Sequence, residues 1–287
     1  MPALKISRVG TVAVIGAGDF GAAIAHALAQ RGRVDEITLI DDQTAIAAGK
    51  ALDIQQSGPI DHFETRLKGS SDPLSAVGAG VIVIADPIGK DEWQGETGLT
   101  LVRRLVEAGT RAPIVFAGAR QTPLMEVVAR ELKVPIERLA GSAAAALVGA
   151  ARALVALELK GSAVDIQLTV SGRPPAVVIG WSSATINGSL IADRVPAHRL
   201  LATTQTLSRL WPLGPQAIAA ATVPIVEAFL HGSRSLIPGV AILDGEFSLR
   251  GVAALLSLEI GRGRITRRVA PTLSPQEQVE LVTKLSR

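Results

Sequence analysis

Three glycines near the N-terminus have the spacing of a turn that binds phosphates. Gly16, Gly18 and Gly21 follow the apolar run 12–15 and fit the pattern G-x-G-x-x-G. Gly16 permits a tight turn, Gly18 lets the backbone approach a pyrophosphate, and Gly21 lets the next helix pack closely on the strand. Because the N–H groups at a helix N-terminus attract anions, the phosphates would lie there. The turn therefore predicts a dinucleotide site.

An acid at the end of the second apolar run, 37–41, supplies the other half of this site. Asp41 follows Gly21 by about twenty residues, the spacing of a carboxylate that binds a ribose 2′-hydroxyl. Such an acid favours NAD and repels the 2′-phosphate of NADP. The expected cofactor residues are Gly16, Gly18, Asp19, Phe20, Gly21 and Asp41. The alternative is a βαβ unit with a tight turn and a capping aspartate.

The segments that position these residues alternate between strands and helices. Buried strands are expected at 81–85 and 114–117, and helices at 22–30, 99–108 and 123–132, while a Gly58–Pro59 break follows the segment 43–56. This alternation indicates a parallel sheet with right-handed crossovers.

The pattern changes after residue 140. A long alanine-rich helix to about residue 159 precedes the alternating run 164–170, which predicts one antiparallel strand. Further strands are expected at 176–180 and 240–243, and helices at 197–210, at 216–230 and after the N-cap Ser274. Since 287 residues exceed the usual single domain, we expect two domains, 1–140 and 141–287.

The amino-acid composition excludes several classes of chemistry and of binding partner. The chain has no cysteine and no tyrosine, which excludes disulfides, thiolate chemistry and a tyrosine acid. Its 29 basic and 26 acidic residues are nearly balanced, so nucleic-acid binding is not expected, and the basic run 261–268 is interpreted as a hairpin turn. The apolar stretch 139–157 contains Arg152 and predicts a buried helix rather than a membrane span. No metal site is expected, and we expect a cytoplasmic protein.

Several ordered blocks extend the glycine motif. After Asp41 the chain reads Gly-Lys-Ala-Leu-Asp-Ile at 49–54, and further blocks occupy 134–141, 183–188 and 243–247. With these blocks the sequence resembles the lactate/malate dehydrogenase family over nearly its whole length. The resemblance implies NAD as cofactor, a Rossmann-type doubly wound parallel sheet, an α/β C-terminal domain of the lactate/malate dehydrogenase type, and a homodimer or homotetramer.

The chemical positions of that family are changed in this sequence. In the family a histidine exchanges a proton with a 2-hydroxy or 2-oxo acid, an aspartate orients the histidine, and arginines bind the substrate carboxylate. Pro174 stands at the histidine position, Leu147 at the aspartate position and Ala150 at an arginine position. Loss of general acid/base help alone typically slows a reaction by about 10²- to 10⁴-fold. We therefore expect no catalytic residue among these positions.

Other basic residues are candidates for binding a small acidic ligand. The substrate loop at 86–97 is shortened and contains Lys90 as its only base, and Arg120 aligns with an expected asparagine. Arg173 and Arg152 lie near the expected cleft, where each either binds an acidic ligand or is solvated. The four histidines, at 26, 62, 198 and 231, fall outside the substrate turn by alignment.

Three functions remain open on the sequence. The favoured one is an NAD-binding homologue without standard 2-hydroxy acid dehydrogenase activity. The first alternative is an active NAD-dependent oxidoreductase on a different or malate-like substrate, which would use Arg173, Arg120 or Lys90 for recognition. The second is a non-catalytic structural or regulatory partner.

Overall fold

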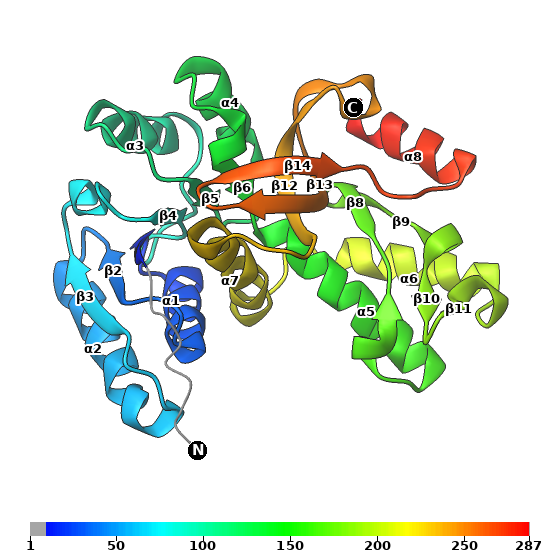
Figure 1. Cartoon of the computed structure of the whole chain (residues 1–287), viewed down its shortest axis with the longest axis horizontal. Helices are drawn as coiled ribbons and strands as arrows, with labels where there is room; N and C mark the ends of the chain where they lie inside the picture. Colours follow the sequence, from blue (N-terminus) through cyan, green and yellow to red (C-terminus); the bar gives the residue numbers. More distant parts are fainter. Residues whose placement is uncertain (1–9, 287) are drawn as a thin grey trace.

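The computed structural model describes residues 10–286. Six parallel strands form one part of an 11-stranded sheet in the order β3-β2-β1-β4-β5-β6, and the sheet continues through the antiparallel strands β12-β13-β8-β9, with β14 beside β13. A separate small sheet has the order β11-β10-β7. Figure 1 shows the parallel strands with α1 and α2 at one side of the molecule and α5 and α6 at the other. The order 3-2-1-4-5-6 is that of a doubly wound dinucleotide-binding fold, which confirms the predicted fold class.

The strands of the structure have the following bounds: β1 (Thr11–Ile15), β2 (Glu36–Ile40), β3 (Arg66–Ser70), β4 (Val81–Ile84), β5 (Ile114–Phe116), β6 (Leu139–Gly141), β7 (Ile166–Gln167), β8 (Val170–Arg173), β9 (Ala176–Ile179), β10 (Thr185–Ile186), β11 (Ser189–Leu190), β12 (Ile237–Asp244), β13 (Arg250–Gly261) and β14 (Arg264–Val269). The α-helices are α1 (Asp19–Arg31), α2 (Thr44–Asp61), α3 (Gly95–Glu107), α4 (Thr122–Glu131), α5 (Ala146–Leu159), α6 (Ala197–Arg209), α7 (Pro215–His231) and α8 (Pro275–Leu285).

The central strand β1 is apolar because helices cover both faces of the sheet. Four of its five residues are buried, as expected for a strand in the middle of a parallel sheet. On one face α1 packs through Ile24, Ala25, Leu28 and Ala29, which recur at helical spacing. The helix ends at Gly32, whose φ of 61° is the left-handed conformation that glycine adopts most easily. This packing fixes the glycine turn between β1 and α1.

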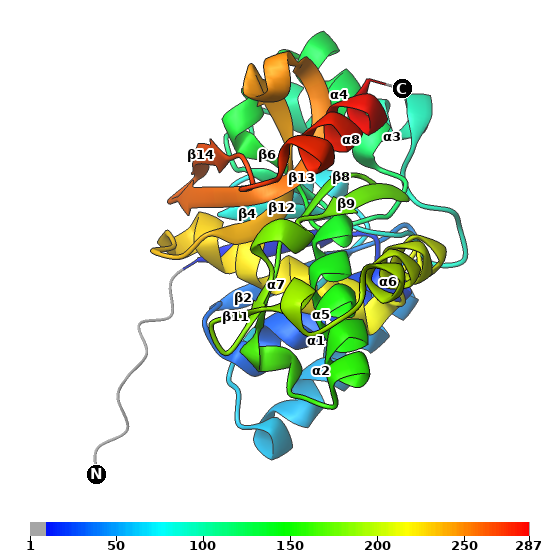
Figure 2. The same cartoon turned by 90° about the vertical axis from the view of Figure 1, so that its right-hand side faces the viewer.

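A buried carboxylate on α7 forms ion pairs with two partly exposed arginines at the end of α1 and just after it. Glu227 is 7% exposed and accepts two hydrogen bonds of 3.0 Å from Arg31 and one of 3.1 Å from Arg33. The bidentate geometry with Arg31 suits a guanidinium and a carboxylate. Hydrogen bonding to Glu227 also raises the pKa of Arg31 above its ordinary value. Figure 1 shows α7 between α1 and α5, and Figure 2 shows α5 in front of α7 in the side view.

Three sequence-based expectations are wrong. The stretch 139–157 is not one helix, because residues 139–141 form β6 and α5 begins at Ala146. The run 164–170 is not one strand: β7 pairs with β10 in the small sheet, β8 pairs with β9 and β13 in the large one, and the chain changes sheet between them. The Gly58–Pro59 break is also wrong, because α2 continues to Asp61 with Pro59 in its last turn. The helix ends instead where the N–H of Phe63 donates to the carbonyl of Gly58.

The C-terminal helix and the basic run follow the expectations. Ser274 caps α8 by accepting from the N–H of Glu277, and the Glu277 side chain accepts from the N–H of Ser274, a reciprocal capping box. The run 261–268 forms the turn and second strand of the β13–β14 hairpin. Gly263 in that turn has a φ of 77°.

Candidate functional site

The glycine turn has the geometry that its sequence predicts. Gly16 has a φ of 103°, and a Cβ atom on Gly21 would overlap the carbonyl oxygen of Gly16, so only glycine fits there. Asp19 and Phe20 form the first turn of α1, with Asp19 exposed. The N-terminus of α1 therefore lies at the carboxyl ends of β1 and β4, the edge of the sheet at which ligands of this fold class bind.

Asp41 lies beside this turn, as predicted. It is 5% exposed, and its Oδ2 accepts hydrogen bonds of 3.0 Å from the N–H groups of Ala17 and Ile88. Oδ1 accepts a 3.2 Å bond from the N–H of Gln43. The bond from Ala17 ties the carboxylate to the glycine turn, whereas the bond from Ile88 comes from the segment after β4.

An acid that sequence reasoning missed occupies the turn itself. Asp86 follows β4, and its Oδ1 accepts a 2.9 Å hydrogen bond from the N–H of Gly21. Its carbonyl oxygen accepts a 2.8 Å bond from the N–H of Gly18, and a Cβ atom on Gly18 would overlap the Asp86 carboxylate. The close approach that Gly18 allows is thus used by a side chain of the same molecule. The Asp86 carboxylate lies where the helix N-terminus attracts anions.

Residues 85–94, which we call the acidic loop, connect β4 to α3 across the carboxyl edge of the sheet. On the β2 side, Lys90 forms an ion pair with Asp42, and the side chain of Gln43 donates a 2.9 Å hydrogen bond to the carbonyl of Ile88. The bond from Ile88 to Asp41 lies on the same side. The loop is therefore fixed beside the acid that would bind a ribose.

The other end of the acidic loop is fixed near β5. Glu92 accepts hydrogen bonds of 3.0 Å and 2.8 Å from the N–H groups of Ala119 and Arg120. Burial raises the pKa of Glu92 above its ordinary value, and the negative charge of Asp86 acts in the same direction, against the lowering effect of the N–H donors and of the Arg120 charge. Two carboxylates of one loop thus face backbone donors at both ends of the crevice.

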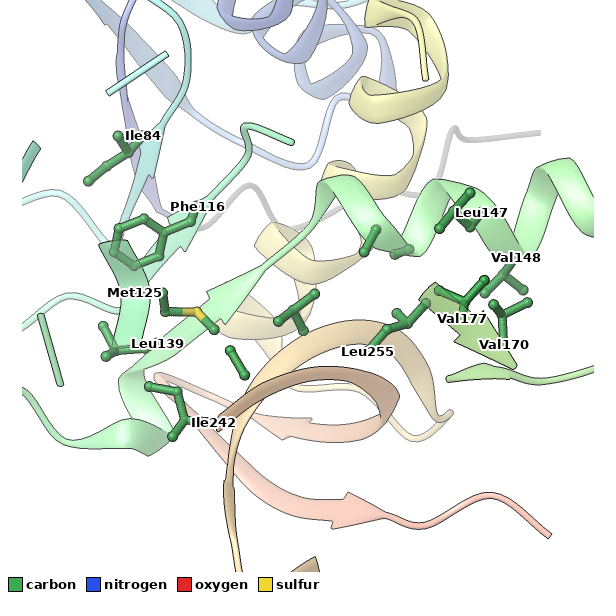
Figure 3. Close-up of a cluster of buried hydrophobic side chains, with 14 of the residues drawn as sticks. Ile84, Phe116, Met125, Leu139, Leu147, Val148, Val170, Val177, Ile242 and Leu255 are labelled. Carbon is green, nitrogen blue, oxygen red and sulfur yellow. The ribbon is translucent and has the colours of Figure 1, made fainter. Parts of the chain in front are cut away.

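Apolar residues occupy the three positions that the sequence analysis assigned to the catalytic groups of the family. Leu147 is fully buried in α5, and Figure 3 shows it among the side chains of the hydrophobic core, near Val148 and Val177. Pro174 lies in the β8–β9 hairpin, and Ala150 is half-buried on α5. Neither a proton-transfer group nor a group that could orient one stands at these three positions.

The candidate ligand-binding bases do not converge on one cavity. Arg173 forms a 3.0 Å ion pair with Glu126, whose other oxygen accepts from the N–H of Ala253. Arg120 is exposed, and Arg152 lines an apolar groove of about 430 Å³ between α5, α7 and β12. Lys90, as described above, pairs with Asp42. The predicted acidic-ligand site therefore remains a prediction, and the structure does not bring its four residues together.

The space between β5 and the second half of the chain is nearly filled. A cavity of about 10 Å³ is lined by Phe116, Met125 and Trp211, among others. That volume is close to the minimum of roughly 10–15 Å³ that one water molecule needs. A 2-hydroxy acid would enter this space only after side chains had moved.

The histidines lie away from the hairpin that contains Pro174. His26 contacts Asp61 at 3.4 Å, His62 ends α2, His198 lies in the first turn of α6, and His231 contacts the carbonyl of Arg33 at 3.2 Å. Within residues 10–286 no three His, Cys, Asp or Glu side chains gather as metal ligands. In the same range no helix is long and apolar enough to cross a membrane.

The fold and the glycine turn define a dinucleotide-binding α/β protein. The family model described as the NAD-binding domain of lactate/malate dehydrogenase matches residues 10–125. A malate dehydrogenase of Thioalkalivibrio sulfidiphilus is 29% identical over 96% of both chains, and one of Syntrophotalea carbinolica is 28% identical over 94% of this chain and 93% of its own. Residues 10–125 thus match the NAD-binding domain of lactate/malate dehydrogenases, and the chain as a whole is similar to malate dehydrogenases.

Solved structures of this family share the fold. The minor L-lactate dehydrogenase of Enterococcus mundtii has a TM-score of 0.87 at 20% identity, covering 97% of this chain and 96% of its own. The malate dehydrogenase of Salinibacter ruber has a TM-score of 0.86 at 24% identity, covering 96% and 94%. Both parts of the chain are therefore arranged as in these proteins.

The cofactor of the family's N-terminal domain is NAD. The residues of this chain fit it in two respects: the turn at Gly16 and Gly21 leaves no room for side chains, and Asp41 lies beside the turn. These residues would hold the pyrophosphate and the ribose, and NAD would supply hydride transfer. The Asp86 carboxylate lies in the same turn and accepts the N–H of Gly21.

Proposed function

We propose that the protein binds NAD and does not carry out standard 2-hydroxy acid dehydrogenation. The observation that carries this proposal is the pairing of an intact glycine turn and Asp41 with the fully buried Leu147 at the position of the orienting acid. Pro174 has no proton to transfer. The molecule thus retains a means of holding a dinucleotide beside a second half that lacks acid/base groups at the family positions.

The test is a titration of purified protein with NADH, in which quenching of the emission of its three tryptophans reports binding. Substrates are then added to the same sample. We expect saturable NADH binding and no NADH consumption with oxaloacetate or pyruvate. NADPH is the matched control, because the carboxylate of Asp41 repels a 2′-phosphate, so NADPH should bind more weakly. NADH turnover with either oxo acid would contradict the loss of activity.

A second candidate function is NAD-dependent oxidation of malate or of another 2-hydroxy acid. It is favoured by the names of the relatives, which are malate dehydrogenases. Arg120 is exposed, and its backbone N–H donates to Glu92 at the end of β5, so its side chain is a candidate for binding a substrate carboxylate. Steady NADH formation from malate and NAD, lost in Arg120→Ala, would favour this candidate over the first.

We infer further that the protein is a cytoplasmic homodimer or homotetramer. The resemblance to the dehydrogenase family supports this assembly, and the absence of cysteine is compatible with a reducing compartment. Sedimentation velocity would give the mass of the assembly directly, and a monomer at micromolar concentration would contradict the inference.

A further inference from the structure

We propose that the acidic loop occupies the dinucleotide groove of its own molecule, so that Asp86 sets the affinity for NAD and nucleotide binds only after the loop has opened. This inference rests on the proposed function, since it concerns how the same groove admits NAD. It goes beyond that function because it assigns a role to Asp86 and Glu92, which are not among the expected cofactor residues.

The first support is the place of Asp86. Its carboxylate accepts the N–H of Gly21 at 2.9 Å and lies against Gly18, the residue whose lack of a side chain lets a pyrophosphate approach. A helix N-terminus stabilises one anion well. Since the Asp86 carboxylate already fills this position, the pyrophosphate of NAD must displace it and is also repelled by it.

The second support is that the loop occupies the groove at two further points. Ile88 donates its N–H to Asp41, the acid that would accept a ribose hydroxyl, at 3.0 Å. Glu92 accepts the N–H groups of Ala119 and Arg120 at the end of β5. The loop therefore contacts the ribose side, the phosphate turn and the far end of the crevice together, and local movement of one side chain does not clear the groove.

The third support is the charge of the loop. It contains three acids, Asp86, Asp91 and Glu92, and one base, Lys90, which is paired with Asp42 outside the loop. A dinucleotide carries negative charge on its pyrophosphate. Loop and ligand thus compete for the same backbone donors and repel each other, which makes closing of the loop and binding of NAD mutually exclusive.

Competition of this kind has a quantitative consequence. When only a fraction of the molecules is open, the measured Kd equals the Kd of the open form divided by that fraction. A variant that weakens the closed loop must therefore bind NADH more tightly, although it makes no new contact with the ligand. Mutations usually weaken binding, so a gain in affinity is a specific sign of the competing loop.

The experiment compares NADH affinity in the full-length protein and in Asp86→Gly, Asp86→Asn and Glu92→Gln. We expect Asp86→Gly to lower the Kd by about tenfold or more, equivalent to about 1.4 kcal/mol. Asp86→Asn keeps the size of the side chain and removes the charge, so it should give a smaller gain, as should Glu92→Gln. Asp91→Asn is the matched control, because Asp91 is exposed on the same loop and the variant loses the same charge. The Kd of this variant for NADH should differ less than twofold from that of the natural protein.

The outcomes separate the two proposals. If the natural protein and Asp86→Gly bind NADH with the same Kd, the role of the loop is overturned while NAD binding stands. If Asp91→Asn gains as much affinity as Asp86→Asn, overall charge rather than the position of Asp86 explains the effect, and the inference is again overturned. If no variant binds NADH, the proposed function fails.

A measurement without nucleotide tests the loop independently. Amide hydrogen exchange of residues 117–121 and 85–94 should be slow in the natural protein, because Glu92 holds the N–H groups of Ala119 and Arg120. Exchange in both segments should accelerate in Glu92→Gln. Equal exchange rates in the two proteins would overturn the closed loop, whatever the affinity for NADH.

Discussion

At the residue scale, the site differs from its sequence-based description mainly at Asp86. The glycine turn and Asp41 were predictable because each lies at a fixed spacing from a strand that its apolar run marks. Asp86 is 65 residues from Gly21, and nothing in the local pattern links the two. The available signal was topological: an acid directly after strand β4, which lies beside β1 in the order 3-2-1-4, must end next to the turn after β1.

Leu147 gives a residue-scale prediction. Because its side chain is fully buried among apolar neighbours, Leu147→Asp would place an unpaired carboxylate in the core. We expect the free energy of unfolding to fall by more than about 3 kcal/mol. Leu147→Met, with a similar volume, should cost less than about 1.5 kcal/mol. Urea denaturation measures both, and equal stability of Leu147→Asp and the natural protein would show that the site is open to water.

This prediction also bears on recovery of activity. Introducing histidine at Pro174 and aspartate at Leu147 would restore the residue types of the family but not the surroundings that those residues need. The aspartate would lie in a core that packs around leucine, where it has no partner for its charge. If the proposed loss of dehydrogenase activity is correct, restoring these two residues should therefore not be enough to recover it.

At the element scale, strands and helices with a regular apolar pattern were predictable, whereas the points at which one element ends and the next begins were not. The expected strands at 81–85 and 114–117 correspond to β4 and β5. The run 164–170 alternates like one strand, but two sheets compete for it and divide it between β7 and β8. The point at which the chain leaves one sheet for the other depends on pairing partners far away in the sequence, so local periodicity does not reveal it.

Helix α8 provides an element-scale prediction about pH. Hydrogen bonds from Ser182 and Ser274 hold the pKa of Glu277 below its ordinary value of 4.5, although burial alone, the largest single effect, would raise it. Glu277→Gln should lower stability at pH 7 by about 1 kcal/mol after allowance for solvent screening. Because the folded-state pKa is depressed, this contribution is present above pH 4.5 and is lost as the pH falls through the depressed value.

The measurement for α8 is thermal unfolding of both proteins between pH 3 and pH 7. The difference in stability between the natural protein and Glu277→Gln should shrink toward acid pH. Glu280→Gln is the control, because Glu280 is exposed on the same helix and pairs with Lys284. A difference for Glu277→Gln that stayed constant down to pH 3 would contradict the role of its charge.

At the scale of the whole molecule, one sheet runs from β3 to β9. The proposed boundary between residues 140 and 141 falls within β6, which pairs with β5 on one side and β12 on the other. The ion pair between α1 and α7 adds a second connection. Contacts of this kind couple the unfolding of the two parts.

We therefore expect a single cooperative unfolding transition. The three tryptophans are placed to test it, since Trp93 lies in the acidic loop and Trp181 and Trp211 lie in the second half of the chain. Tryptophan fluorescence and far-ultraviolet circular dichroism should give the same midpoint in urea, and Glu277→Gln should shift both midpoints equally. Two separate midpoints would show that the parts unfold independently.

The acidic loop also changes how the supply of nucleotide relates to the amount of folded protein in a cell. A protein that binds NAD in an open groove gains stability with NAD concentration, because the ligand binds only the folded form. In this molecule the loop closed by Asp86 and Glu92 would raise the Kd, so a given concentration of NAD stabilises the folded form less. The lifetime of the natural protein against proteolytic turnover should consequently gain less from NAD than the lifetime of Asp86→Gly.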